Sequence, residues 1–382
     1  MGNRAKAKNK PGYYLSILLF MALGGLAGML VGPLLREVLP QAGNPGQTLL
    51  RVGILLLLLA VAVWLQIVIH EGGHLVFGIM TGYRFSSFRI GSLNFIEMGE
   101  HIQLKRMGLA GTMGQCLLSP PEDRENFPVM PYLLGGEILN LLVSLLCLGG
   151  YFLLSGVARL RFFLLCMGLV GILFAVLNGA PSRMNMVDND GYNALLLRKN
   201  PQAKRGLWIA LQMNARLAQG ESLADMPEEW FDLPDEVQMG SSLVASLAVF
   251  RANWLMDRMA FEEADQLMSF LLSRSGVSLP GIYRHVLLSD RAYCALMGAG
   301  SSQVLDTYRG QAHQKAIKLL WSQLGILRTE YAYALLASRD PQAANAALEE
   351  FDKQAAQHPY AGDVRSERKL LQLAAERAAA QA

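Results

Sequence analysis

Charged residues are scarce in this chain of 382 residues: only 17% are Asp, Glu, Lys or Arg, whereas 52% are hydrophobic. The mean hydropathy of +0.26 is too high for an ordinary cytosolic protein of this length. The scarcity is also uneven, because long apolar runs lie before about Gly179 and the charges concentrate after it. We therefore expect a membrane-embedded half followed by a water-soluble half.

Two further features are missing from the sequence. The chain has no long basic run with interleaved aromatic residues, and its net charge is only +3, which argues against nucleic acid as a partner. It has four cysteines and no Cys-x-x-Cys pair, so a disulfide framework is not expected. Cys147 and Cys166 lie inside apolar runs, where cysteine usually serves as a small buried hydrophobe.

Four apolar runs predict membrane-spanning helices, which need about 20 apolar residues each. They cover residues 13–31, 49–80, 131–155 and 162–177. The first run follows a basic N-terminal tail, as in a cleavable signal peptide. It is long for a signal peptide, however, and we expect an uncleaved helix. The second run carries no charge between Ile54 and Ile69 and is the clearest span.

Lys and Arg are unevenly divided between the two sides of this four-span topology. One side holds most of them: Arg4, Lys6, Lys8, Lys10, Arg84, Arg89, Lys105, Arg106, Arg124, Arg183, Arg198, Lys199, Lys204 and Arg205. The other side holds only Arg36, Arg51, Arg159 and Arg161. Because basic loops stay in the cytosol, we expect both termini there.

The segments outside the apolar runs predict a small sheet and a helical region. Residues 83–106 contain short stretches rich in Phe and Ile, separated by glycines, and indicate two or three strands; residues 108–124 look like a loop. Residues 207–219 fit an amphipathic helix, and residues 226–236 an irregular linker. After residue 241, apolar residues recur at helical spacing in blocks that resemble tetratricopeptide-like helix pairs, although an irregular helical bundle fits as well.

The second apolar run continues directly into His70-Glu71-Gly72-Gly73-His74, an HExxH motif. Residues i and i+4 of a helix share one face, so His70 and His74 can present two imidazoles to one metal ion. Glu71 lies close enough to hold a water on that metal and to act as general base for it. Ionisable residues within a membrane segment are costly and usually functional. The motif therefore predicts a catalytic Zn²⁺ site and not a chance match.

A catalytic zinc takes three protein ligands and keeps one open position. Asp190, in an Asp-Gly pair just after the fourth apolar run, is the leading candidate for the third ligand. Asp188 is two residues away and is an alternative. The weaker candidates are Glu100, His101 and Glu137.

These motifs together resemble the site-2 proteases, a family of intramembrane zinc metalloproteases. Members of that family carry HExxH on one span, a Gly-Gly…Asn pattern on the next, and Asn-x-x-Pro followed by Asp-Gly at the end of a third. This chain matches in the same order with His70 to His74, Gly135-Gly136 with Asn140, Asn178 to Pro181, and Asp190-Gly191. The resemblance covers about residues 49–200. The gap between Pro181 and Asp190 is longer than usual, which keeps Asp188 open as the ligand, and there is no room for an inserted PDZ domain.

The resemblance implies an endopeptidase that cleaves in or near the transmembrane segments of membrane proteins, in a bacterial cell membrane. Asp190 would be the third zinc ligand and Glu71 the general base. Asn140, Asn178, Pro181 and Gly191 would shape the substrate cleft. We also expect the strand-like stretch Phe85–Leu104 to pair with an unwound substrate by strand addition, and the resemblance points the same way; the alternative is that these strands only cap the cytosolic face.

The expected organisation is mainly helical, with four domains. Residues 1–48 form a basic tail and first span, 49–200 the intramembrane protease core, 201–240 a linker with an amphipathic helix, and 241–382 a soluble helical domain that can bind a protein partner. Two alternatives stay open. One is a non-catalytic membrane scaffold that recruits partners through the helical domain, although a scaffold needs neither HExxH nor Asp-Gly. The other is a different zincin class that uses a Glu ligand.

Overall fold

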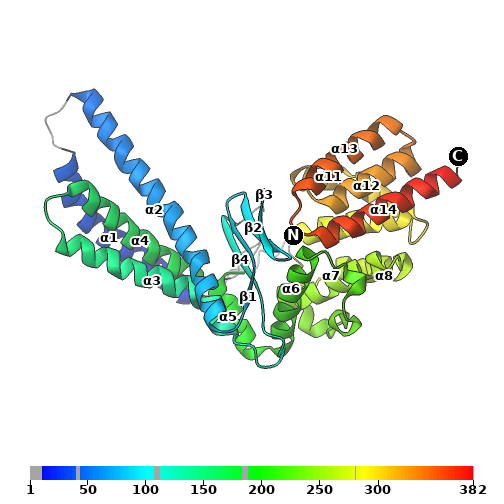
Figure 1. Ribbon diagram of the computed structural model, residues 1–382, viewed down its shortest axis with the longest axis horizontal. Helices are drawn as coiled ribbons and strands as arrows, with labels where there is room; N and C mark the ends of the chain where they lie inside the picture. Colours follow the sequence, from blue (N-terminus) through cyan, green and yellow to red (C-terminus); the bar gives the residue numbers. More distant parts are fainter. Residues whose placement is uncertain (1–10, 40–43, 107–111, 183–187, 280, 382) are drawn as a thin grey trace, which may run out of the picture. The chain divides into compact units, whose positions relative to one another are not determined.

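The computed structural model describes residues 11–39, 44–106, 112–182, 188–279 and 281–381 (Figure 1). Over these residues it has fourteen α-helices and one four-stranded antiparallel sheet, which confirms the predicted mainly helical class. The chain divides into two compact units. The first comprises residues 1–70 and 136–177, and the second comprises residues 71–135 and 178–382.

Three helices are long and apolar enough to cross a membrane, which indicates a multi-pass membrane protein. They are α2 (Pro45–Met80), α3 (Val129–Leu153) and α4 (Ala158–Gly179). All three were predicted as spans from their apolar runs. Helix α1 (Pro11–Val38) covers the first predicted run, but the side chains of residues 11–20 lie outside the described residues, as do the basic tail and Arg183. The first of the four predicted spans and the cytosolic placement of both termini therefore stay predictions.

Helices of the first unit pack closely through apolar and small residues. Leu55 and Ala62 of α2 share a buried cluster with Phe162 and Leu165 of α4. A Cβ atom added to Gly171 of α4 would lie 2.1 Å from Ser144 Oγ of α3. Only a glycine allows so close an approach, as is common between membrane helices.

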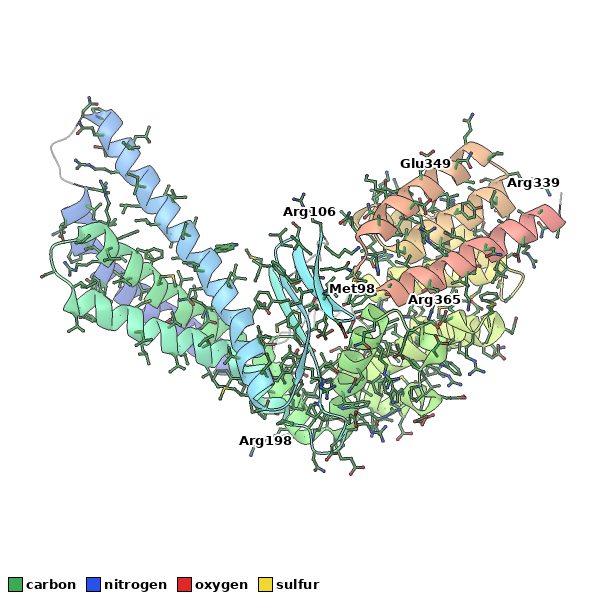
Figure 2. The ribbon with its side chains drawn as sticks, viewed as in Figure 1. Met98, Arg106, Arg198, Arg339, Glu349 and Arg365 are labelled. Carbon is green, nitrogen blue, oxygen red and sulfur yellow. The ribbon has the colours of Figure 1, made fainter. Side chains whose placement is uncertain are left out.

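The sheet lies in the second unit, and its strands are ordered β3-β2-β1-β4. They span Arg84–Ile90 (β1), Leu93–Met98 (β2), His101–Arg106 (β3) and Gly114–Ser119 (β4). Gly91 and Gly99, both with positive φ, form the tight turns that join the first three strands. Met98 and Arg106 mark the ends of β2 and β3 in Figure 2. Phe88, Phe95 and Leu104 stand opposite one another across β1, β2 and β3.

The sequence prediction was right for the first three strands and wrong for β4, which forms where a loop was expected. Residues 114–119 lack β-branched side chains, and Pro120 and Pro121 follow them. The strand exists because it pairs with β1 over its whole length, from Arg84↔Ser119 to Ile90↔Gly114, with one irregularity near Phe85. This pairing joins distant parts of the chain, and no local sequence pattern predicts it.

The rest of the second unit is helical. Helix α5 covers Asp190–Lys199 and α6 covers Pro201–Ala218, so the predicted amphipathic helix begins earlier than expected, with Asn200 as its N-cap. Three short 3₁₀ helices follow: Leu223–Asp225, Glu228–Phe231 and Glu236–Gly240. Their side chains Trp230 and Phe231 are buried in the apolar core of the unit.

The C-terminal region is a stack of paired helices. The helices are α7 (Ser242–Asp257), α8 (Phe261–Ser273), α9 (Gly281–Leu296), α10 (Gln303–Arg309), α11 (Gln311–Leu319), α12 (Leu324–Tyr333), α13 (Pro341–Gln357) and α14 (Ala361–Ala380). Helix α12 packs against α9, α13 and α14. Asp340 caps α13 by accepting hydrogen bonds from the backbone N–H groups of Gln342 and Ala343. Whether these pairs are tetratricopeptide repeats stays a prediction.

Candidate metal centre

The HExxH motif lies near the C-terminal end of α2, in unbroken helix. His70, Glu71 and His74 are each only 8% exposed. Gly135 of α3 lies against this part of α2, because a Cβ atom there would be 2.5 Å from the carbonyl oxygen of Gly73. The glycines of the two motifs therefore let α3 approach the backbone of α2 beside the histidines.

Asp190 is the first residue of α5, and its position is fixed by its neighbours. The side chain of Asn189 caps α5 by accepting a hydrogen bond from Tyr192 N (3.0 Å), and it also accepts one from Ser182 N (3.0 Å). Gly191 lies so close to the end of α4 that a Cβ atom would be 2.0 Å from Gly179 O. The Asp-Gly pair thus combines a carboxylate with a residue that must have no side chain.

His70, His74 and Asp190 form a group that can hold a metal ion: one ligand atom from each lies within 4.8 Å of the other two. His74 Nε2 is 3.7 Å from Asp190 Oδ2. A tetrahedral zinc with ligand bonds of about 2.0–2.1 Å needs ligand atoms about 3.4 Å apart, so small side-chain rotations would suffice. Two imidazoles and one carboxylate fit zinc and leave a fourth position open.

The other ring nitrogen of His74 has a backbone partner. His74 Nδ1 lies 2.8 Å from the carbonyl oxygen of Tyr132, which can only accept a hydrogen bond. Nδ1 therefore carries a proton, and Nε2, which lies toward Asp190, is the nitrogen that can bind a metal. Such a hydrogen bond to the second nitrogen orients a metal-binding histidine. Tyr132 is itself held, because its hydroxyl donates to Cys116 O (2.8 Å) on β4.

The other candidates for the third ligand lie outside this group. Asp188 Oδ2 accepts a hydrogen bond from Ser242 Oγ of α7 (2.8 Å). Glu100 and His101 are exposed at the start of β3, and Glu137 is buried on α3. Over the part of the chain that the structure describes, the histidines are thus grouped with Asp190 and with none of these alternatives.

The residues that the resemblance assigns to a substrate cleft lie in different surroundings. Asn140 is fully buried, and its Nδ2 donates to Gln66 Oε1 (2.8 Å), while Gln66 Nε2 donates to Met167 O (2.7 Å). Asn140 thus links α3 to α2 and, through Gln66, to α4. Asn178 is half-buried at the end of α4, and Pro181 is exposed. The cleft role of all of them stays a prediction.

Two residues beside Glu71 were missed by the sequence analysis. Gly114, the first residue of β4, lies against the Glu71 side chain, because a Cβ atom there would be 2.4 Å from Glu71 Oε1. Arg89 of β1 was counted only as a cytosolic charge, yet it is 2% exposed and donates a hydrogen bond to Gly114 O (3.3 Å). Both contacts depend on the pairing of β1 with β4, which local sequence patterns did not reveal.

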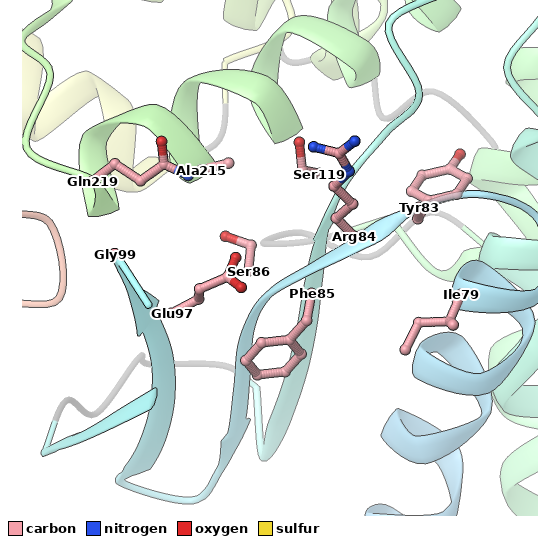
Figure 3. A pocket seen from close by; sticks show the side chains of 10 residues that line it. All are labelled: Ile79, Tyr83, Arg84, Phe85, Ser86, Glu97, Gly99, Ser119, Ala215 and Gln219. Carbon is pink, nitrogen blue, oxygen red and sulfur yellow. The ribbon is translucent and has the colours of Figure 1, made fainter. Parts of the chain in front are cut away.

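A cavity of about 540 Å³ lies elsewhere in the second unit, between the sheet and α6. Figure 3 shows Ser86 and Glu97 close together on the side of the strands, with Gln219, the residue that follows α6, across from them. None of the three grouped metal-binding candidates lines this cavity, so it is separate from the candidate metal centre.

Comparisons of this chain with models of protein families, with curated proteins and with solved structures give no match.

Proposed function

We propose that this protein is a zinc-dependent endopeptidase that cleaves membrane proteins within or beside their transmembrane segments. One observation carries the proposal: an HExxH motif at the end of an apolar, membrane-length helix has its two histidines grouped with the carboxylate of Asp190. Two buried histidines and a carboxylate, with a buried glutamate next to the first histidine, are the parts that metal-assisted peptide hydrolysis requires.

Each residue has a distinct task in this proposal. His70, His74 and Asp190 would hold the zinc, and the hydrogen bond from His74 Nδ1 to Tyr132 O would keep the ring in its ligating orientation. When bound, zinc would polarise the carbonyl group of the scissile peptide bond and would make a bound water more acidic. Glu71 would accept the proton of the attacking water and would return that proton to the leaving amine.

Substrate binding by strand addition is part of the proposal, but the structure changes which strand can serve. The expected stretch Phe85–Leu104 includes β1, and β1 is flanked on both sides by β2 and β4, so it has no free edge. The edges of the sheet are β3 and β4. Strand β4 begins against the side chain of Glu71. Strand β3 is the opposite edge of the sheet, three strand spacings or roughly 14 Å from β4. We therefore place substrate pairing at the Gly114 end of β4.

Metal analysis of purified protein tests the site. The wild type is expected to hold about one zinc per chain, Asp190→Ala to lose it, and Asp188→Ala to keep it. Equal zinc content in all three proteins would rule out Asp190 as the ligand, and loss in Asp188→Ala alone would assign that role to Asp188.

Activity is measured with two probes, because the natural substrate is not defined by the site. One is β-casein, an unfolded protein, and the other is a dye-labelled single-span peptide with a Gly-Pro pair that loosens its helix. A membrane helix hides its peptide bonds in hydrogen bonds, so a helix-breaking pair should favour cleavage. Cleavage of either probe that a chelator abolishes and zinc restores supports the proposal. A wild type that cleaves neither probe contradicts it.

A further inference from the structure

Arg89 is a buried guanidinium next to the candidate active site. It lies in β1, opposite Asn94 of β2 and Gln115 of β4, and only 2% of it is exposed. Burying a charged side chain is costly unless hydrogen bonds compensate for the lost water. The hydrogen bonds of Arg89 must therefore compensate for its burial, and they also indicate its role.

The hydrogen bonds of Arg89 converge on the segment that leads into β4. Nη1 donates to Gly91 O (2.8 Å) and to Thr112 O (3.4 Å). Nη2 donates to Thr112 Oγ1 and to Gly114 O (3.3 Å). The planar fork of the guanidinium thus binds Thr112 and Gly114 at once, which a lysine ammonium cannot do with the same geometry.

Gly114 carries this contact to Glu71. A Cβ atom at residue 114 would lie 2.4 Å from Glu71 Oε1 and 2.6 Å from Glu71 Cγ, so the backbone of Gly114 borders the carboxylate directly. The charges of Arg89 and Glu71 also interact. Burial lowers the pKa of Arg89, and the Glu71 carboxylate acts in the opposite direction.

We propose that Arg89 is a positioning residue for Glu71: by holding Thr112 and Gly114, it fixes the start of β4 as a wall that keeps the Glu71 carboxylate in its reactive orientation. This inference rests on the proposed function, in which Glu71 is the general base. A general base must lie within hydrogen-bond reach of the proton that it abstracts. If the start of β4 is no longer held in place, the Glu71 carboxylate can rotate out of its reactive orientation while all three metal ligands remain.

The test uses three variants and one matched control in the full-length protein, with the same two probes. Arg89→Ala removes the guanidinium, Arg89→Lys keeps a charge without the fork, and Gly114→Ala pushes a methyl group against Glu71. Arg84→Ala removes an exposed arginine from the same strand and serves as the control. Each protein is assayed for zinc content, kcat and KM.

We expect Arg89→Ala and Gly114→Ala to keep their zinc and to lose about 10- to 100-fold in kcat, as for a misplaced general base; KM rises as well wherever the change also disturbs substrate pairing at the same end of β4. Arg89→Lys should fall in between, and Arg84→Ala should match the wild type. Added guanidinium ion should restore part of the kcat of Arg89→Ala, because it can enter the vacated space. It should not help Gly114→Ala, in which the guanidinium of Arg89 is still present.

Three results would overturn the inference. The first is a wild-type kcat in Arg89→Ala; if that variant does not fold, a wild-type kcat in Arg89→Lys carries the same weight. The second is a loss of kcat in Arg89→Ala that follows a loss of zinc. The third is a loss of kcat in Arg89→Ala that added guanidinium does not relieve. Either result would mean that Arg89 only stabilises the sheet. The proposed function fails separately, on a wild type that shows no zinc-dependent cleavage, and the inference would then fall with it.

Discussion

At the scale of single residues, the predicted ligands and their supports differ in how far the sequence reveals them. His70, Glu71 and His74 are neighbours on one helix, so their spacing alone places them together. Asp190 could be identified as a candidate ligand only from the Asp-Gly pattern. Spacing alone did not show whether Asp190 or Asp188 is the ligand. The role of Arg89 beside the site was not found, because its contacts with Thr112 and Gly114 join segments that lie more than twenty residues apart in the chain.

Gly191 offers a prediction at this scale. A methyl group at this position would lie 2.0 Å from Gly179 O, so the first turn of α5 must move away from the end of α4. We expect Gly191→Ala to lose most of its zinc, because Asp190 moves with that turn. Gly72→Ala is the control: this glycine has open space around its α-carbon, and the variant should keep its zinc. Full zinc content in Gly191→Ala would show that the close approach is not needed to place Asp190.

At the scale of helices and strands, apolar runs predicted the three membrane-length helices to within a few residues, because a long apolar helix is determined locally. The sheet was predicted only where turns with glycine link consecutive strands. Strand β4 could not be predicted, since it is defined by pairing with β1 and by the hydrogen bond between Tyr132 and Cys116 O. Its consequence for function is large, because β4 is the strand beside Glu71.

The hydrogen bond from Asn140 to Gln66 lets an experiment decide whether Asn140 serves helix packing or substrate binding. Gln66 lies one turn before His70, and its side-chain oxygen accepts a hydrogen bond from Asn140. We expect Asn140→Ala to lower the free energy of unfolding in micelles by about 1 kcal/mol or somewhat more, the size found for interhelical hydrogen bonds. Cleavage should fall only as far as the folded fraction and the zinc content do. If cleavage is lost while stability and zinc content are unchanged, Asn140 is a cleft residue, as the resemblance to site-2 proteases implies.

The choice of β4 as the substrate-pairing strand predicts that the other edge is dispensable. Gln103 lies in the middle of β3, an exposed edge strand, and proline is tolerated best at such edges. Gln103→Pro should therefore keep its zinc and cleave both probes at a rate close to that of the wild type. A variant with full zinc content and little cleavage would move the pairing site to β3. Proline substitutions between Phe88 and Glu97 cannot decide this question, because they would break the pairing of β1 with β2.

At the scale of the whole molecule, the structure carries a second group of charges far along the chain from HExxH. In the C-terminal helices, a cavity of about 200 Å³ is lined by one arginine and four carboxyl groups. They are Arg328 of α12, Asp257 of α7, Asp290 of α9, and Asp363 and Glu367 of α14. Burial and the neighbouring carboxylates raise the pKa of Asp363 and of Glu367 to about 7.

These raised pKa values predict a pH dependence of stability with a defined sign. The folded protein keeps protons on Asp363 and Glu367 at pH values where the unfolded chain, with ordinary carboxyl pKa values near 4, has lost them. Their contribution to stability is therefore full below about pH 4, falls as the pH rises to about 7, and is constant above that. Asp363→Asn removes one of these groups. We expect its melting temperature to rise relative to that of the wild type between about pH 5 and about pH 8.

Histidines act in the opposite direction and must be separated from this effect. Burial lowers the pKa of His313, to about 4, and that of His358, so both destabilise the folded protein as the pH falls. Both histidines and Glu367 are present in the wild type and in Asp363→Asn, so the difference between the two melting curves isolates the contribution of Asp363. Parallel pH dependences for the two proteins would show that Asp363 is ionised in the folded state at all these pH values.

The central claim is that Glu71 acts as a base on a metal held by other residues, and one measurement tests it most directly. Zinc content and cleavage of β-casein and of the single-span peptide are determined on the same preparation of Glu71→Gln. Glutamine keeps the size of the side chain but cannot take a proton, and Glu71 is not among the three grouped ligands. We predict about one zinc per chain, as in the wild type, with cleavage reduced at least 100-fold. Wild-type turnover by Glu71→Gln would contradict the account.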